Sequence, residues 1–184
     1  MTRLIIARHG ETDWDAQGRI QGSLDIPLNS SGKKQAQRLA EELSGFGIGS
    51  VYSGPSACCF TTANEVASRH NVKVKKMGEL NELDYGVWQG LLLSDIKKRY
   101  RKQYGLWKKS PSAERPPRGE CIREACDRAV SAIHKIADKH KDAVACVISH
   151  DTICSILKCY LKNVNLDKLW SVSFGEKLWE AFDI

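Results

Sequence analysis

The stretch Ile5-Ile6-Ala7-Arg8-His9-Gly10-Glu11 decides the fold, because an apolar run passes directly into an arginine, a histidine and a glycine. A strand that ends in a sharp glycine-containing turn presents its last side chains at the carboxyl edge of a sheet, where α/β proteins bind ligands. Arg8 and His9 at that edge suit an anion, most simply phosphate. The competing interpretation is a strand that merely ends in a polar turn.

Segments with the pattern of strands alternate with segments of helical spacing along the rest of the chain. We expect strands at residues 4–7, 50–53, 72–74, 143–149 and 179–184, the last of them at a sheet edge. We expect helices from residue 32 to the glycines at 45 and 47, and at 55–70, 93–104, 120–140 and 152–161. Such alternation predicts an α/β fold, a three-layer sandwich with a mostly parallel central sheet.

The length of 184 residues predicts a single domain, residues 1–184, with a capping excursion at about 78–118 that contributes one short helix. Hydrophobic residues make up 42% and charged residues 27% of the chain, a balance that excludes global disorder. No apolar run approaches the roughly 18 residues of a membrane helix. With no signal-peptide pattern at Met1, we expect no membrane partner and a cytoplasmic location.

Basic residues concentrate between Lys97 and Lys109, and the net charge is +6. Aromatic residues lie among them, as they do in some nucleic-acid-binding surfaces. No recognised nucleic-acid module surrounds the run, so we expect a solvated helix face or a rim that attracts anionic small molecules. The sequence therefore predicts no nucleic-acid partner.

Seven cysteines are present, an odd number, and no two of them are spaced as Cys-x-x-Cys. This pattern predicts neither a disulfide scaffold nor a zinc site. Free thiols in a reducing compartment are the simplest account.

A second histidine follows the second strongly apolar run. Ser149-His150-Asp151 ends the strand expected at 143–149 and begins a helix, whose N-terminus favours anions. Glu82 lies at the start of the excursion, where partial burial would raise its pKa and suit proton donation. Two histidines at strand ends with a carboxylic acid above them predict a phosphoryl-transfer site that needs neither metal nor cofactor.

These features resemble the histidine phosphatase superfamily, in the branch of phosphoglycerate mutase and its small phosphatase relatives. The similarity covers nearly the whole chain, through Arg8-His9-Gly10-Glu11-Thr12, Gly18-Arg19-Ile20-Gln21-Gly22, Tyr52-Ser53, Glu82 with Tyr85-Gly86, Trp88-Gln89-Gly90 and Ser149-His150. The resemblance implies a phosphoglycerate mutase-like fold.

The resemblance also implies a role for each matching residue. His9 would be the nucleophile that becomes phosphorylated, and Glu82 the proton donor. Arg8 and His150 would bind the phosphoryl group. The remaining matched pocket positions are Thr12 and Gln21.

Two pocket positions depart from the family pattern. The helix after Tyr52-Ser53 usually supplies a second arginine, and Cys58 stands there instead. The residue after Trp14 is usually asparagine and is Asp15 here. A lost preorganised donor typically costs on the order of 100- to 1,000-fold in rate. Asp15 would repel phosphate, unless it turns away or pairs with an arginine.

Three functions remain open. The first is a phosphomonoesterase acting on a small phosphorylated metabolite, with Arg19, Arg115 or Arg118 replacing the lost cation. The second is a degenerate paralogue that serves as partner subunit of an active phosphatase. The third, phosphoglycerate mutase, is disfavoured because the mutases generally carry a longer excursion.

The basic excursion would suit a substrate with a carboxylate or a second phosphate. The edge strand would allow a homodimer or heterodimer.

Overall fold

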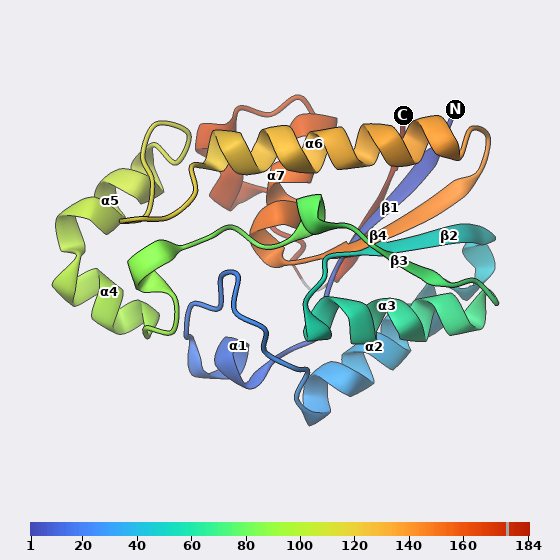
Figure 1. Cartoon of the computed structure of the whole chain (residues 1–184), viewed down its shortest axis with the longest axis horizontal. Coiled ribbons are helices and arrows are strands. Elements are labelled where there is room, and N and C mark those ends of the chain that lie inside the picture. Colours follow the sequence, from blue (N-terminus) through green and yellow to red (C-terminus); the bar gives the residue numbers. More distant parts are fainter. Residues whose placement is uncertain (176) are drawn as a thin grey trace.

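The computed structural model describes residues 1–175 and 177–184, and it is an α/β sandwich built on one five-stranded sheet (Figure 1). The strand order is β3-β2-β4-β1-β5. The strands are β1 (Arg3–Arg8), β2 (Ile48–Ser53), β3 (Val74–Lys76), β4 (Val144–Ser149) and β5 (Trp179–Asp183). The first four are mutually parallel, and β5 runs antiparallel to β1 at one edge. The predicted fold class is confirmed.

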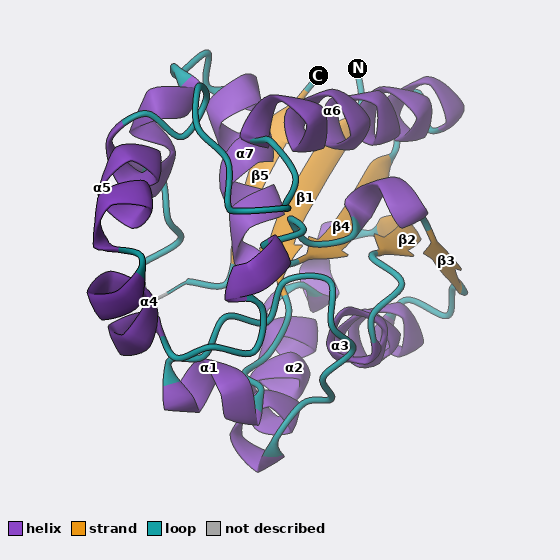
Figure 2. Ribbon diagram, turned by 60° about the vertical axis from the view of Figure 1, so that its left-hand side comes forward, coloured by secondary structure: helices purple, strands orange, loops and turns teal. Residues whose placement is uncertain are grey.

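Helices cover both faces of the sheet, as Figures 1 and 2 show. Alternate side chains of β1 pack to opposite sides. Leu4 and Ile6 join the core beneath α6 and α7, whereas Ile5 and Ala7 join the core beneath α2 and α3. These helices are α2 (Ser30–Glu42), α3 (Ala57–Arg69), α6 (Ile122–Lys139) and α7 (Asp151–Leu161). Because both faces of the sheet are covered by helices, the sequences of β1 and β4 are almost continuously apolar.

The pairing of β1 with β4 places the two site histidines at one edge. The register sets Arg8 opposite Ser149, the last residue of each strand. His9 N–H donates to the Ser149 carbonyl at 3.1 Å, which extends the pairing one step past the strand. Because both strands run the same way, His9 and His150 emerge together at their carboxyl ends.

Three local predictions differ from the structure. The third strand lies at Val74–Lys76, two residues beyond its predicted start. The excursion holds two helices rather than one, α4 (Leu93–Arg99) and α5 (Arg101–Lys109). The helix is interrupted at Tyr100, whose ring packs edge-on against Trp88. The short helix α1 (Asp13–Gln17) was not predicted.

The aromatic residues of the excursion form a small core of their own. Trp88 is 1% exposed and contacts Tyr104 and Trp107 edge-to-face or tilted, and Tyr85 packs on Trp107. This agrees with a packing role rather than a substrate mouth. Within residues 1–175 and 177–184, no helix combines the length and apolar character needed to span a bilayer.

Candidate active site

The two histidines at the strand ends lie against each other. The ring centroids of His9 and His150 are 4.6 Å apart, at an interplanar angle of 72°. Both are buried, with exposures of 3% and 2%. His150 is also the N-cap residue of α7, so the site faces a helix N-terminus, where negative charge is favoured.

A backbone contact orients the ring of His9. Its Nδ1 lies 2.6 Å from the carbonyl oxygen of Gly10, an acceptor, so Nδ1 carries the proton and donates it. This tautomer leaves Nε2 of the neutral ring with a free lone pair. Glycine is required at position 10, because a Cβ there would lie 2.2 Å from the Gly32 carbonyl oxygen. The Arg-His-Gly sequence therefore supplies both the oriented imidazole and the close packing next to it.

His150 is held in the neutral form. Burial, followed by the charge of His9, lowers the pKa of His150 to about 3. Its Nε2 lies 2.9 Å from the hydroxyl oxygen of Ser56. His9 therefore lies beside a hydrogen-bonded imidazole whose neutral form is favoured.

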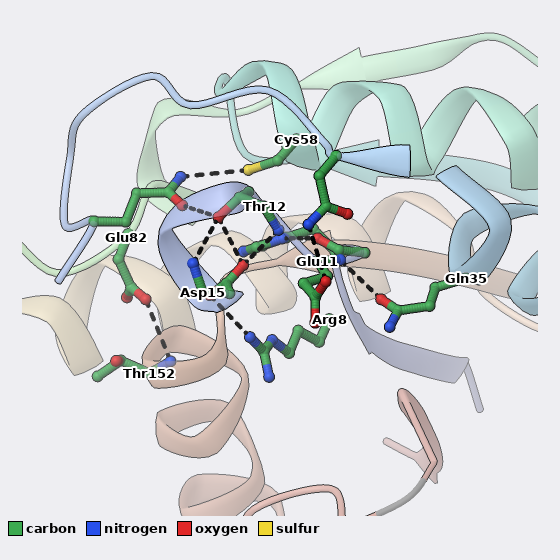
Figure 3. Close-up of polar contacts among 12 residues, drawn as sticks. Arg8, Glu11, Thr12, Asp15, Gln35, Cys58, Glu82 and Thr152 are labelled. Carbon is green, nitrogen blue, oxygen red and sulfur yellow. Dashed lines mark hydrogen bonds and ion pairs between the residues drawn. The ribbon is translucent and has the colours of Figure 1, made fainter. Parts of the chain in front are cut away.

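Arg8 is paired with Asp15. The distance between Arg8 Nη2 and Asp15 Oδ1 is 3.1 Å, and the two side chains are 29% and 25% exposed (Figure 3). Of the two orientations expected for Asp15, the structure shows the pair with an arginine. The other carboxylate oxygen accepts from the backbone N–H and hydroxyl of Thr12, completing the capping box of α1. Among the described residues, the buried Nε of Arg8 has no hydrogen-bond partner, so it remains available to an anion.

A chain of contacts links the remaining pocket residues (Figure 3). The Thr12 hydroxyl oxygen, whose proton goes to Asp15, lies 3.3 Å from Gln21 Oε1, and Gln21 Nε2 donates to Cys58 Sγ at 3.5 Å. Thr12 and Cys58 are fully buried, and Gln21 is 8% exposed. The predicted pocket positions are thus brought together around the first turn of α3.

Glu82 lies buried beside the start of α7. Its Oε1 accepts from the Leu83 backbone N–H at 2.7 Å, and its Oε2 from that of Thr152 at 3.4 Å (Figure 3). Burial raises the pKa of Glu82 to about 7, although the Leu83 hydrogen bond opposes the rise. A carboxyl group with this pKa is partly protonated near neutral pH, as a general acid requires.

Sequence reasoning missed the residue that supports the Glu82 loop. The guanidinium of Arg128, on α6, donates to the backbone carbonyls of Glu79, Asn81 and Glu82 at 2.7, 2.7 and 3.1 Å. It also pairs with Glu120, at 2.6 Å from Nε to Oε1. An arginine on the polar side of an amphipathic helix gave no signal for this role.

The three arginines proposed to replace the lost cation have other partners or lie in solvent. Arg19 donates to the Gly90 carbonyl and lies over the ring of Trp14. Arg115 is exposed and pairs with Glu124, and Arg118 is exposed. Across the described chain, none of the three makes a hydrogen bond to the residues around His9. The suggestion that one of them rebuilds the pocket finds no support.

Cys58 lies beside the two histidines. The side-chain donor atoms of His9, Cys58 and His150 all lie within 4.8 Å of one another, and all three residues are buried. The pKa of Cys58 falls well below its usual range, because the neighbouring Cys59 thiol donates to it and the imidazoles favour the thiolate. In turn, burial disfavours the His9 imidazolium, but the interaction with Cys58 outweighs burial and raises the pKa of His9.

Local spacing could not group these three residues, because they are far apart in the chain. The matched pocket position of Cys58 was the one sequence signal that places it near the two histidines.

Comparisons with known proteins agree with the fold and show the family. The family described as histidine phosphatase superfamily (branch 1) matches residues 4–179. Phosphoserine phosphatase 1 of Hydrogenobacter thermophilus is 33% identical over 171 residues, covering 93% of this chain and 81% of that protein. The adenosylcobalamin/alpha-ribazole phosphatase of Escherichia coli is 27% identical over 182 residues, covering 99% and 90%.

A solved structure gives the same result. Bacillus stearothermophilus YhfR aligns with a TM-score of 0.93 and 26% identity, covering 100% of this chain and 92% of its own. The resemblance first drawn from Arg8-His9-Gly10 thus extends over the whole fold. This chain belongs to branch 1 of the histidine phosphatase superfamily.

Proposed function

We propose that this chain hydrolyses a small phosphomonoester through a phosphohistidine on His9. The observation that carries the proposal is the orientation of His9, whose Nδ1–H is bonded to Gly10, which leaves Nε2 free, and whose ring centroid lies 4.6 Å from that of the buried His150. The small-molecule phosphatases among the relatives support it. The mechanism uses only side chains and water.

The reaction has two steps. Nε2 of His9 attacks phosphorus, and the bond between phosphorus and the leaving oxygen breaks as Glu82 gives its proton to that oxygen. Water then attacks the phosphohistidine while the Glu82 carboxylate takes a proton from it, and phosphate leaves with His9 restored. The free Nε of Arg8 and the ring of His150 would hold the equatorial phosphate oxygens.

Turnover of p-nitrophenyl phosphate and phosphoserine by the purified chain tests this proposal. His9→Ala should abolish turnover, and His134→Ala is the matched control because His134 is exposed and contacts Tyr160. Acid-labile, base-stable label from a ³²P-phosphomonoester should appear on the wild type and be absent from His9→Ala. Equal turnover by His9→Ala and wild type would refute the mechanism.

Substrate preference follows from a screen of phosphorylated metabolites. The basic run from Lys97 to Lys109 supports a substrate that carries a carboxylate or a second phosphate. A preference for esters with neutral tails would count against this choice. The seven free thiols support a reducing compartment such as the cytoplasm.

A second candidate function is favoured by one observation, the pairing of Arg8 with Asp15 in a pocket where Cys58 replaces a cation. On that basis the chain would be a weakly active subunit that supports an active phosphatase. An inactive wild type, together with restored turnover by the Asp15→Asn, Cys58→Arg double variant, would favour this candidate. Phosphoryl transfer to a phosphoglycerate instead of water would favour a mutase.

A further inference from the structure

The cluster of His9, Cys58 and His150 unites three good zinc ligands from separate parts of the fold. His9 follows β1, His150 follows β4, and Cys58 lies in the first turn of α3. Their donor atoms lie within 4.8 Å of one another, and exposures are 3%, 0% and 2%. We propose that this cluster binds one Zn²⁺ ion through His9 Nε2, Cys58 Sγ and a ring nitrogen of His150.

The geometry is close to what zinc requires. Tetrahedral zinc sites have Zn–S distances of about 2.3 Å and Zn–N distances of about 2.0–2.1 Å, so their ligand atoms lie roughly 3.3–3.6 Å apart. The present separations reach that range if the donor atoms approach by about one ångström. Three protein ligands leave a fourth position for water or an anion. Thiolate and imidazole together suit Zn²⁺ better than the hard cations Mg²⁺ and Ca²⁺, which prefer oxygen.

The surrounding hydrogen bonds orient these ligands. The bond from His9 Nδ1–H to the Gly10 carbonyl is of the kind that fixes metal-binding histidines, and it presents Nε2. Gln21 Nε2 donates to Cys58 Sγ at 3.5 Å, a contact that stabilises a thiolate. The Ser56 hydroxyl lies 2.9 Å from His150 Nε2 and 3.4 Å from Cys58 Sγ, so it contacts two of the three proposed ligands.

The charge of the pocket also allows a cation. Arg8 is the basic residue next to His9, and its guanidinium is paired with the carboxylate of Asp15 at 3.1 Å. That pair offsets the repulsion that an isolated guanidinium would exert on a metal ion. The basic residue next to His9 therefore already has a carboxylate partner, in contrast to a pocket built only for phosphate.

Zinc binding would compete with the proposed hydrolysis, because His9 Nε2 cannot both bind a metal ion and attack phosphorus. The binding inference itself needs no turnover. Inhibition by micromolar zinc is therefore an expected consequence only if the proposed function holds, whereas metal binding can be measured directly in an inactive chain.

The decisive experiment is a Co²⁺ titration of the full chain after treatment with a chelator, because Co²⁺ reports thiolate and tetrahedral ligation in its absorption spectrum. We expect one equivalent to bind with a sulfur-to-cobalt charge-transfer band, and Zn²⁺ to displace it. Cys58→Ser should lose the band. Cys59→Ser should keep it, and it is a matched control because Cys59 is the adjacent, equally buried cysteine. His150→Asn should weaken binding by at least about 100-fold, since even ligand-supporting residues are worth 10–100-fold.

A wild type without the charge-transfer band would overturn the inference, and so would a Cys58→Ser variant that keeps it. Circular dichroism of each variant establishes that it folds. If Cys58→Ser does not fold, X-ray absorption of the wild-type zinc complex decides the question. One sulfur and two nitrogen ligands support the site, and two or more sulfur ligands refute it, because they would place the ion at other cysteines.

Discussion

The Asp15 carboxylate lies 3.1 Å from the guanidinium of Arg8, so the arginine next to His9 is already paired within its own chain. The same carboxylate caps α1 through Thr12. Asp15 therefore stabilises the start of α1 and also pairs with Arg8, the cation that a phosphate group would otherwise bind. An anion entering the pocket must compete with Asp15 for Arg8.

Asp15→Asn should release this competition. An asparagine can still cap α1 through its side-chain oxygen, but it carries no charge. We expect the inhibition constant of inorganic phosphate to fall by roughly 10-fold. Phosphate would no longer have to displace a carboxylate from Arg8, and solvent partly screens that contact. Thermal unfolding should change little. Unchanged phosphate affinity in a folded variant would mean that Arg8 does not bind the anion.

Glu82→Gln should slow hydrolysis by an amount that depends on the leaving group of the substrate. Without a proton donor, hydrolysis of an alkyl ester such as phosphoserine should slow by about 100- to 10,000-fold, the usual contribution of general acid catalysis. The p-nitrophenolate group needs little protonation, so hydrolysis of p-nitrophenyl phosphate should suffer far less. The ratio of the two kcat values measures the effect. Equal losses on both substrates would show that Glu82 acts on something other than the leaving oxygen.

The activity should decline as the pH rises through about 7, where buried Glu82 loses its proton. The direction follows because the proposed role requires the protonated carboxyl. The negative charge of Asp151 also raises the pKa of Glu82. Asp151→Asn should therefore lower that pKa and move the alkaline limb of the kcat profile to lower pH. Asp138→Asn, an equal charge change at an exposed position of α6, should leave the limb in place. If the alkaline limb moved to higher pH in Asp151→Asn, or moved equally in both variants, its assignment to Glu82 would be wrong.

Gly10→Ala should destabilise the fold because the new methyl group would meet the Gly32 carbonyl oxygen at 2.2 Å. We expect the free energy of unfolding to fall by about 1–3 kcal/mol or more in urea titrations. Gly105→Ala is the matched control, since Gly105 lies within α5 with nothing within 4 Å of the added carbon. That change should raise the free energy of unfolding by about 0.5–1 kcal/mol. Similar shifts in both variants would disprove the steric constraint at Gly10.

The sequence predicts the parts of this molecule that depend on local pattern. The apolar runs before Arg8 and His150 indicate buried strands, and their polar ends indicate one shared edge, as observed. The break at Tyr100, whose ring packs against Trp88, has no counterpart in the local sequence pattern.

Part of the site lies beyond sequence reasoning for the same reason. Arg128 supports the Glu82 loop from 46 positions away in the chain, and no periodic pattern in the sequence indicates this contact. The grouping of Cys58 with the two histidines likewise exists only after β1, α3 and β4 assemble. The choice between the two orientations of Asp15 required coordinates, because both fit the same residues.

The register that sets Arg8 opposite Ser149 has a consequence for biosynthesis. A ribosome that has finished β1 must still synthesise everything up to residue 149 before the neighbour of that strand exists. Until then, an apolar segment ending in a reactive imidazole has no partner, and no competent pair of histidines can form. The two histidines of this site therefore come together only late in synthesis.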